Sequence, residues 1–362
     1  MENYKCKSVG IIGSGIQGAC TGLQLIKKGI PVTIFDRQDP LSQDFKPASY
    51  GNAGHFSPYA ILQLNRPDIL FDVPKMLFSS YGPLALKWNY VPKMINWFFY
   101  YLKNCNKKSM MHTAKNMHQI LSLSNDAYEE IFQEIDTKGL VEKKGIIYVW
   151  TNKNLKSRNL EIKVRDELGI KQKLLSQKEV LELEPNLKPV FDAGIIYESA
   201  MHARDPHGIL KQIFKLFLNG GGKFIQTNIK SIEQSKTDET IIRSDNEEYK
   251  FEKSVVASGA FSKQFTDQLG EKIPLDTERG YHVHFKGQER LISRPVIFLD
   301  RGFGMTPMNQ GLRAVGTVEL GGIENPLSKK RIKYVIKNEK MICNIIRIFD
   351  EIPSLVFDLI FL

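Results

Sequence analysis

A glycine-rich turn directly after an apolar run near the N-terminus limits what this chain can fold into. Residues 8–12 (Ser-Val-Gly-Ile-Ile) have the character of a short buried strand, and the turn Gly13–Gly18 follows at once as Gly-Ser-Gly-Ile-Gln-Gly. Apolar residues then recur with helical spacing between Ala19 and Lys28, and Pro31–Phe35 has the character of a second strand. This order of strand, G-x-G-x-x-G turn, helix and strand predicts a βαβ unit with a parallel sheet.

Each part of the turn has a physical task in binding a dinucleotide. Gly13 permits the tight turn, Gly15 lets a pyrophosphate approach the backbone, and Gly18 lets the helix pack close to the strand. The start of the helix offers backbone amides and the positive end of its dipole to the phosphates. Asp36 ends the second strand and can accept hydrogen bonds from ribose hydroxyls, but it would repel a 2′-phosphate, so Arg37 beside it does not indicate NADP. The predicted dinucleotide contacts here are Gly13, Ser14, Gly15, Ile16, Gln17, Gly18, Asp36 and Arg37, and the motif alone does not choose between FAD and NAD.

A second group of small residues lies at 48–58, which reads Ala-Ser-Tyr-Gly-Asn-Ala-Gly-His-Phe-Ser-Pro. Small side chains and two glycines suit a backbone that passes close to a flat ligand, and they suit an ordinary turn equally well. Composition leaves these two interpretations open.

Further segments of the chain carry a family resemblance. They are Ser49–Pro58, Ala203–Pro206, Val255–Ser262, Glu278–Val283, Met305–Pro307, Gly311–Arg313 and Gly316–Glu319. Together with the N-terminal turn, they resemble the FAD-dependent D-amino acid dehydrogenases, within the larger group that holds D-amino acid oxidase, glycine oxidase and sarcosine oxidase. The resemblance covers roughly residues 8–335.

The resemblance implies FAD as the cofactor, no metal, and oxidation of a D-amino acid to an imino acid by hydride transfer to flavin N5. Water then hydrolyses the imino acid to a 2-oxo acid and ammonia. Three groups of cofactor contacts are implied. The segment like Ser49, Gly51, Asn52, Ala53 and Gly54 lines the pyrophosphate and isoalloxazine, Ala257, Ser258 and Gly259 return to the cofactor, and Ile229, in the strand after a glycine run, meets the adenine.

The substrate carboxylate calls for an arginine, because a guanidinium binds two oxygens at once. Arg313 is the first candidate, since it lies in the segment that resembles the substrate-domain strands over the flavin, and Arg279 is the second. Arg301 and Arg204 are weaker candidates. A surface salt bridge is the alternative role for the first two.

Other candidate site residues are aromatic. Tyr281 and His282 lie in the stretch that the family places near its substrate pocket. His55 follows the glycine expected to line the flavin, where it would contact, tune or covalently tether the ring, and plain packing is the alternative.

The expected fold class is α/β: a Rossmann-type FAD-binding domain with an inserted α+β substrate domain built on an antiparallel sheet. We assign residues 1–60, 200–275 and 325–362 to the first domain, and 61–199 and 276–324 to the second. The predicted substrate-domain strands are 145–150, 278–285, 296–299 and 311–319, and strands at 223–226, 241–243 and 254–257 complete the cofactor domain. One long amphipathic helix is predicted over 116–137, and another over 205–220 with Asp205 as its N-cap and Pro206 at its first position.

Charge and composition limit the kinds of molecule that this protein is expected to bind. The 50 basic and 40 acidic residues give a net charge of +10 that is spread along the chain, so we expect no nucleic-acid partner. The four cysteines are too far apart for a metal clip and are expected to be reduced and buried in a cytoplasmic protein. Aromatic residues crowd 76–102, which indicates either core packing and active-site coverage, or peripheral association with the inner face of the cell membrane, where a quinone is reached.

Several alternatives stay open. The substrate is a D-amino acid or another small amine such as glycine or sarcosine, and the electron acceptor is a quinone or oxygen. An NAD-dependent enzyme is disfavoured by the returning flavin-type segments. Relatives generally continue past the end of this chain with a Gly-, Pro- and His-rich stretch that contacts the flavin, whereas here the resemblance fades after Tyr334. A truncated nucleotide-binding remnant with impaired activity is therefore a further alternative.

Overall fold

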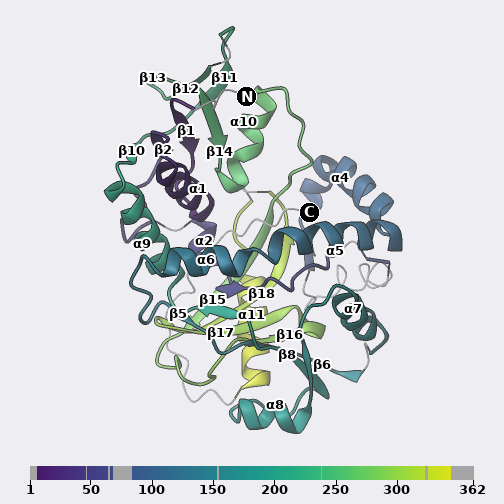
Figure 1. Ribbon diagram of the computed structural model, residues 1–362. Helices are drawn as coiled ribbons and strands as arrows, with labels where there is room; N and C mark the ends of the chain where they lie inside the picture. The colour runs from purple at the N-terminus through teal and green to yellow at the C-terminus, as the bar shows by residue number, and fades with distance from the viewer. Residues whose placement is uncertain are drawn as a thin grey trace. The chain divides into compact units, whose positions relative to one another are not determined.

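The computed structural model describes residues 6–45, 47–63, 66–67, 84–152, 155–237, 239–322 and 325–343 (Figure 1). The chain divides into two compact units. Unit 1 contains Met1–Tyr50, Glu134–Asp136 and Pro206–Leu275, and unit 2 contains Gly51–Gln133, Thr137–Asp205 and Asp276–Leu362.

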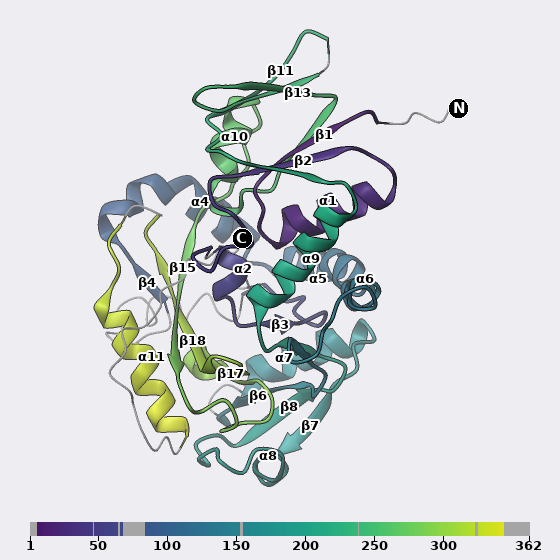
Figure 2. The same cartoon turned by 90° about the vertical axis from the view of Figure 1, so that its left-hand side faces the viewer.

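Unit 1 is built on a parallel sheet with the strand order β10-β2-β1-β14. The strands are β1 (Val9–Ile12), β2 (Val32–Asp36), β10 (Lys223–Gln226) and β14 (Lys253–Val256). Helices α1 (Ile16–Lys27) and α9 (Pro206–Asn219) lie side by side in Figures 1 and 2. They pack tightly, since a Cβ added to Gly22 of α1 would lie 2.8 Å from Ile34 Cδ1 and 3.0 Å from Phe217 Cε2. The predicted βαβ unit and the helix after Asp205 are confirmed.

An antiparallel meander in unit 1 packs against the same sheet. Its strands are β11 (Ser231–Gln234), β12 (Thr240–Arg243) and β13 (Glu248–Phe251), and a 3₁₀ turn (Gly259–Phe261) and helix α10 (Ser262–Gln268) follow β14. The ring of Phe35 on β2 lies 4.8 Å from Tyr249 and 5.8 Å from Phe251, centroid to centroid. Because Phe35 and its chain neighbour Ile34 point to opposite faces of β2, the meander and the two helices cover opposite faces of the sheet.

Unit 2 is built on an eight-stranded sheet with the order β15-β18-β17-β16-β6-β8-β7, in which β4 also pairs with β18. The strands are β15 (Glu278–Phe285), β18 (Gly311–Leu320), β17 (Phe303–Met308), β16 (Val296–Phe298), β6 (Ile146–Trp150), β8 (Ala193–Tyr197), β7 (Lys173–Ser176) and β4 (Leu84–Leu86). The predicted strands are therefore joined as expected. The sheet is antiparallel apart from two parallel pairs, β16 with β6 and β18 with β4.

The pairing of β15 with β18 contains a bulge. Glu278–Gly280 pair with residues 320–318, whereas Tyr281–Phe285 pair with residues 316–312, so Thr317 on β18 is the extra residue. Thr317 has a φ of 66°, which a β-branched residue rarely adopts. Its hydroxyl oxygen accepts a hydrogen bond from Arg331 Nη1 at 3.2 Å, which helps hold the bulge in place.

Helix α11 (Lys329–Ile342) belongs to unit 2, which corrects the predicted domain boundary. Helix α11 lies alongside β15 in Figure 2. Val335 and Ile342 are fully buried in one core with Tyr281 and Phe285 of β15. The assignment of 325–362 to the cofactor domain is therefore wrong for its described part, 325–343. Residues 51–60 and 200–205, also assigned to that domain, belong to unit 2, where β3 (His55–Phe56), β9 (Met201–Ala203) and β5 (Val141–Glu142) form a small sheet.

The helices of unit 2 differ from the prediction in one place. They are α4 (Val91–Asn104), after a 3₁₀ turn at Trp88–Tyr90, then α5 (Lys107–Leu121), α6 (Ser124–Phe132), α7 (Leu155–Glu167) and α8 (Gln177–Leu183), and a further 3₁₀ turn spans Leu299–Arg301. The long helix predicted over 116–137 is wrong, because α5 ends at Leu121. There the hydroxyl of Ser124 donates to the carbonyl of Leu121 at 2.7 Å, and Ser122 donates to Gln119, so both serines bond to carbonyls of the preceding turn.

The aromatic segment divides into two parts. Residues 76–83 lie outside the described residues. On and before α4 the side chains of Trp88, Phe99 and Tyr100 are 64%, 62% and 54% exposed, so core packing is wrong for these three, whereas Met94 is fully buried. Among the described residues, no helix is long and apolar enough to cross a membrane.

Cysteine burial also differs in part from the prediction. All four cysteines are free, but only Cys343 is buried, and the other three are half-buried.

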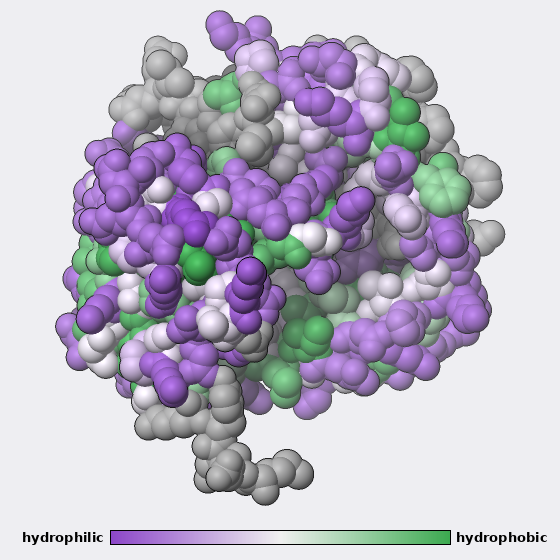
Figure 3. Space-filling model, turned by 90° about the horizontal axis from the view of Figure 1, so that it is seen from above, coloured by the Kyte–Doolittle hydropathy of each residue, from purple (hydrophilic) through white to green (hydrophobic). Residues whose placement is uncertain are grey.

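The face drawn in Figure 3 is mostly hydrophilic with small apolar groups, as expected for charges that are scattered along the chain.

Candidate functional site

The glycine turn of unit 1 has two positions, Gly13 and Gly18, that have no room for a side chain. Gly13 has a φ of 111°, and a Cβ on it would lie 2.4 Å from the carbonyl oxygen of Ala257. A Cβ on Gly18 would lie 1.9 Å from the carbonyl oxygen of Gly13. Gly15 is different: apart from its chain neighbours, the only atom of the described residues within 4 Å of an added Cβ would be Ser49 Oγ, at 3.6 Å. The backbone at Gly15 is therefore open to a ligand, as a pyrophosphate requires.

The start of α1 is suited to phosphate. Gly15 is its N-cap and has no side chain to cap the helix, and the first turn has no acidic residue. The hydroxyl of Ser49 accepts a hydrogen bond from the amide of Ile16 at 3.1 Å. A helix N-terminus of this kind presents amides and positive dipole charge without a competing carboxylate.

Asp36 is tied to the glycine turn. Its Oδ2 accepts hydrogen bonds from the amide and the hydroxyl of Ser14, at 2.8 and 2.9 Å, and its Oδ1 accepts from the amide of Gln38 at 3.2 Å. Each carboxylate oxygen accepts more than one hydrogen bond, so these contacts are compatible with a ribose hydroxyl at Oδ1. With the open backbone at Gly15, this arrangement fits the adenosine diphosphate part of FAD.

Ala257 and Ser258 return to the end of β1. The amide of Ala257 and the hydroxyl of Ser258 both donate to the carbonyl of Ile12, at 2.8 and 2.9 Å, and Gly259 follows with a φ of 55°. Arg37 is exposed, and its guanidinium lies 4.6 Å from the ring centroid of Phe261.

Ile229 is placed differently from the prediction. It lies between β10 and β11 and not in a strand, and its side chain is buried in a core with Ile12 and Phe35. A contact between Ile229 and adenine would therefore come from its backbone.

In unit 2, Arg313 lies at the centre of a polar cluster. It is 1% exposed, its Nε donates to His284 Nε2 at 2.6 Å, and its Nη1 donates to the carbonyl of Asn52 at 2.7 Å. Arg313 and His284 are paired across β18 and β15. The structure thus brings the first-choice arginine together with the segment predicted to line the flavin. We call Arg313, His282, His284 and Asn52 the arginine cluster.

The two histidines of the cluster are neutral, and their tautomers follow from their partners. His284 Nε2 accepts from Arg313, so its proton is on Nδ1, and His282 Nδ1 lies 3.0 Å from the carbonyl oxygen of Gly51, so it donates. The rings are 5.1 Å apart, centroid to centroid. Burial, and then the positive charge of Arg313, lower the pKa of His282 to about 2 and that of His284 to about 3.

His55 is joined to the glycine segment through Thr306. The hydroxyl of Thr306 donates to the carbonyl of Ala53 at 2.9 Å, so it accepts from His55 Nε2, also at 2.9 Å. Burial and then the neighbouring His202 lower the pKa of His55 to about 3. Gly54 has a φ of 72°, and its carbonyl accepts from the amide of Ala203, which pins this segment to β9.

Arg279 and Tyr281 lie elsewhere on β15. The Nη1 of Arg279 is 3.5 Å from Glu319 Oε1, and the hydroxyl of Tyr281 donates to the same oxygen at 3.0 Å. Tyr281 packs in the core beneath α11, and Lys87 Nζ is 3.7 Å from the second oxygen of Glu319. The structure therefore separates Arg279 and Tyr281 from the arginine cluster.

The weaker arginine candidates are also engaged with protein groups. Arg301 Nη1 donates to Asn338 Oδ1 at 3.2 Å, and Arg204 forms an ion pair with Glu142 at 2.9 Å.

Sequence reasoning missed His284 and Thr306 as site residues. Both lie in segments that carry the resemblance or adjoin it. The available signal was the period of two along a strand, which places His284 on the same face as His282.

Comparison with known proteins bears on this arrangement. The sequence pattern of a family described as "FAD dependent oxidoreductase" matches residues 8–349, beyond the limit near 335 expected from the resemblance. A D-amino-acid oxidase of Bradyrhizobium diazoefficiens is 29% identical over 326 residues, which are 90% of this chain and 77% of the relative. A D-amino acid dehydrogenase of Vibrio atlanticus is 26% identical over 347 residues, 91% of this chain and 80% of the relative.

Solved structures share the fold. A glycine oxidase from Geobacillus kaustophilus aligns with a TM-score of 0.66 at 16% identity, over 92% of this chain and 77% of that one. An L-proline dehydrogenase from P. horikoshii aligns with a TM-score of 0.67 at 14% identity, over 94% and 77%.

Proposed function

The chain belongs to the FAD-dependent oxidoreductase family, and on this basis we propose that it oxidises the α-carbon–nitrogen bond of D-amino acids. The product is an imino acid, which water hydrolyses to a 2-oxo acid and ammonia. The two curated relatives described above, a D-amino-acid oxidase and a D-amino acid dehydrogenase, support this substrate class. FAD, when bound, supplies the acceptor for the hydride.

Unit 1 supplies the groups that would hold the adenosine and pyrophosphate. The open backbone at Gly15 and the start of α1, whose first turn carries no acidic residue, suit the phosphates, and Asp36 suits the ribose. Ala257 and Ser258 stabilise the turn, because both donate hydrogen bonds to the carbonyl of Ile12, the residue immediately before Gly13.

The observation that carries the proposed activity is the buried Arg313 beside Asn52. Two of its N–H groups are given to His284 and Asn52, and these bonds fix the plane of the guanidinium. A guanidinium held in this way is suited to orient a carboxylate through its planar fork. The proposed role of Arg313 is to bind the substrate carboxylate, and thereby to place the α-carbon.

The neutral state of His282 and His284 supports the proposed role of Arg313 in binding the carboxylate. Because the pKa values of His282 and His284 are far below neutrality, the positive charge of the arginine cluster resides on Arg313. An anionic carboxylate is then attracted to one place in the cluster. His282 and His284 act as positioning residues, which hold Gly51 and Arg313 respectively.

As the electron acceptor, we favour a quinone reached at an anionic membrane surface at the inner face of the cell membrane, with oxygen as the alternative. The supporting observation is the exposed apolar side of α4, where Ile95 and Phe99 are 61% and 62% exposed and lie between Lys93 and Lys103. Co-sedimentation with anionic vesicles, and turnover with a soluble quinone against oxygen, test this part; a lipid-indifferent protein that reacts only with oxygen contradicts it.

The central test is spectroscopic. The purified protein should show a flavin absorption band, and anaerobic addition of D-amino acids should bleach it, whereas L-amino acids should not. If glycine or sarcosine bleaches the band and D-amino acids do not, the protein is instead an oxidase of small amines. A colourless protein that cannot take up FAD would instead support a nucleotide-binding remnant without catalysis.

A further inference from the structure

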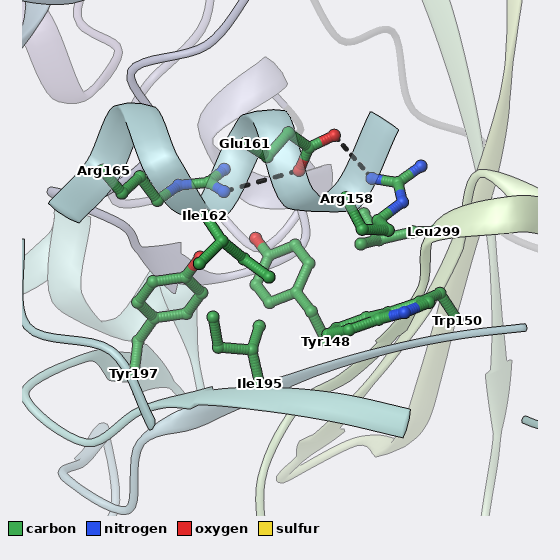
Figure 4. A pocket seen from close by; sticks show the side chains of 9 residues that line it. All are labelled: Tyr148, Trp150, Arg158, Glu161, Ile162, Arg165, Ile195, Tyr197 and Leu299. Carbon is green, nitrogen blue, oxygen red and sulfur yellow. Dashed lines mark hydrogen bonds and ion pairs between the residues drawn. The ribbon is translucent and has the colours of Figure 1, made fainter. Parts of the chain in front are cut away.

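Unit 2 contains a small pocket lined by three charged side chains from one helix, away from the residues assigned above. Arg158, Glu161 and Arg165 follow at intervals of three and four along α7 and so share one face of the helix. Figure 4 shows them above the side chains of β6 and β8, with Glu161 between the two arginines. The remaining lining residues are Tyr148, Trp150, Ile162, Ile195, Tyr197 and Leu299.

The charges in this pocket do not balance. Glu161 Oε1 is 2.5 Å from Arg158 Nη1, and its Oε2 is 3.4 Å from Arg165 Nη1. Arg66 Nη1 is also 2.7 Å from Glu161 Oε1. Within the part of the chain that the structure describes, neither Arg158 nor Arg165 pairs with a second carboxylate. These two cations therefore share the single negative charge of Glu161, and Arg66 is a third cation on the same carboxylate.

The acidic groups on neighbouring elements are engaged elsewhere. Asp300 accepts two hydrogen bonds from Thr151, and Asp166 accepts one from Gln172. The arginines and Glu161 are nearly buried, with side-chain exposures of 6 to 11%. Buried positive charge without a compensating anion is costly, so the pocket has an electrostatic reason to take one up.

Two N–H donors in the pocket walls reinforce this reasoning. Trp150 is 4% exposed, and its Nε1 has no hydrogen-bond partner among the described residues. The Nε of Arg158 is likewise buried without one. Buried donors are normally satisfied, and both of these belong to residues that line the same pocket. An acceptor in this pocket that reaches either N–H would satisfy a buried donor.

The size of the pocket limits the occupant. The space between its side chains is about 240 Å³ including the part open to solvent, but the room inside suffices for no more than about one water-sized sphere. A phosphate or an amino acid is too large for this space. A monovalent inorganic anion close to water in size is not.

We propose that this pocket, between α7 and strands β6 and β8, binds a small monovalent inorganic anion of the halide class, such as chloride. Arg158 and Trp150 donate to the anion, and Arg165 adds positive charge. The bound ion ties α7 to the sheet and so stabilises unit 2. This site is separate from the arginine cluster, and it does not depend on the proposed activity.

Thermal unfolding of the FAD-loaded protein tests the site directly. Gluconate, which is too bulky for the pocket, is replaced stepwise by chloride or bromide at constant ionic strength. We expect a saturable rise in Tm on the order of a few degrees. Crystals soaked in bromide should show an anomalous peak beside Trp150 Nε1 and Arg158 Nε. Equal Tm values in gluconate and chloride, or the absence of that peak, overturn the proposal.

Matched variants show whether these donors are responsible. Trp150→Phe removes one N–H and keeps most of the packing, so the chloride concentration at half-effect should rise about tenfold or more. Trp88→Phe changes an exposed tryptophan of the same unit and should leave that concentration unchanged. Arg158→Gln should abolish the chloride effect. An unchanged half-effect concentration in Trp150→Phe contradicts the assignment of its N–H to the anion.

Discussion

Arg313 Nε donates to His284 Nε2 across 2.6 Å, between two residues that are directly paired on neighbouring strands. The bond requires an unprotonated Nε2, so His284 is neutral while it lasts. It also fixes the guanidinium on the side where Asn52 offers its carbonyl. One cross-strand pair therefore sets both the charge and the orientation of the proposed carboxylate site.

Replacing Arg313 with lysine tests the carboxylate role. Arg313→Lys keeps a positive charge but loses the planar fork, so KM for a D-amino acid should rise about tenfold or more, at roughly 1.4 kcal/mol per tenfold. The flavin spectrum should persist, because the proposed adenosine contacts lie in unit 1. Arg301→Lys is the matched control and should leave KM unchanged. If both variants have the same KM as the original protein, Arg313 does not bind the carboxylate.

Two glycine substitutions separate folding from cofactor binding. Gly18→Ala would place a methyl group 1.9 Å from the Gly13 carbonyl oxygen, so unit 1 should be strongly destabilised. In Gly15→Ala the nearest atom of the described residues, chain neighbours aside, is Ser49 Oγ at 3.6 Å from the new methyl carbon, so the fold should be retained. That methyl group would nevertheless occupy the space needed by the pyrophosphate. Urea unfolding and FAD titration measure the two effects, and normal FAD affinity in Gly15→Ala would contradict the proposed phosphate position.

The stability of the protein should fall as the pH drops below about 6.5. Burial lowers the pKa of four histidines: His55 and His284 to about 3, His282 to about 2 and His202 to about 4. Between these values and 6.5 the unfolded chain binds protons that the folded chain does not. Each histidine then lowers the free energy of unfolding by about 1.4 kcal/mol per pH unit. Glu278 opposes this trend, because burial raises its pKa to about 7 and its folded form binds the extra proton.

Urea unfolding from pH 7 to pH 5 measures that slope. His202 offers the cleanest variant, since both of its ring nitrogens are buried without a hydrogen-bond partner among the described residues. His202→Phe should make the slope shallower by one histidine's share, and leave the protein relatively more stable at pH 5. An unchanged slope would show that His202 does not resist protonation.

The ion pair of Arg279 with Glu319 should be structural. Glu319→Gln removes the buried negative charge that faces Arg279 and Lys87, and it should cost about 3 to 5 kcal/mol of unfolding free energy. Glu233→Gln removes an exposed pair with Arg243, which water and salt screen, and should cost far less unfolding free energy. KM for the substrate, measured below the unfolding temperature, should not change in either variant. A raised KM in Glu319→Gln alone would return Arg279 to the substrate site.

Much of the fold could be predicted from local patterns. The strands at 223–226 and 278–285 have the predicted bounds, because apolar alternation and turn residues marked both ends. The long helix failed at Ser122 and Ser124, where hydroxyl groups bond to carbonyls of the preceding turn, an interaction that hydrophobic periodicity does not reveal. Helix α11 was assigned to the wrong unit because its apolar face does not say which sheet it covers.

The parts of the site that were predictable are those whose residues lie close together in the sequence. The glycine turn and Asp36 follow from spacing in one βαβ unit, where the geometry is local. The resemblance ranked Arg313 above Arg279, but it does not show the partners of either side chain. Only the strand pairing shows that Arg279 lies opposite Glu319 and Arg313 opposite His284.

The bulge at Thr317 decides which side of the sheet receives the arginine. If the pairing of Glu278 with Leu320 continued without interruption, His284 would lie opposite Ala314, and Arg313 would lie opposite Phe285, which is in the core beneath α11. The extra residue moves every later partner by one and so turns Arg313 away from that core. Deleting one residue from the middle of β18 would therefore exchange a charged side chain for an apolar one at both locations, so the proposed carboxylate site depends on the length of this strand as much as on the identity of its arginine.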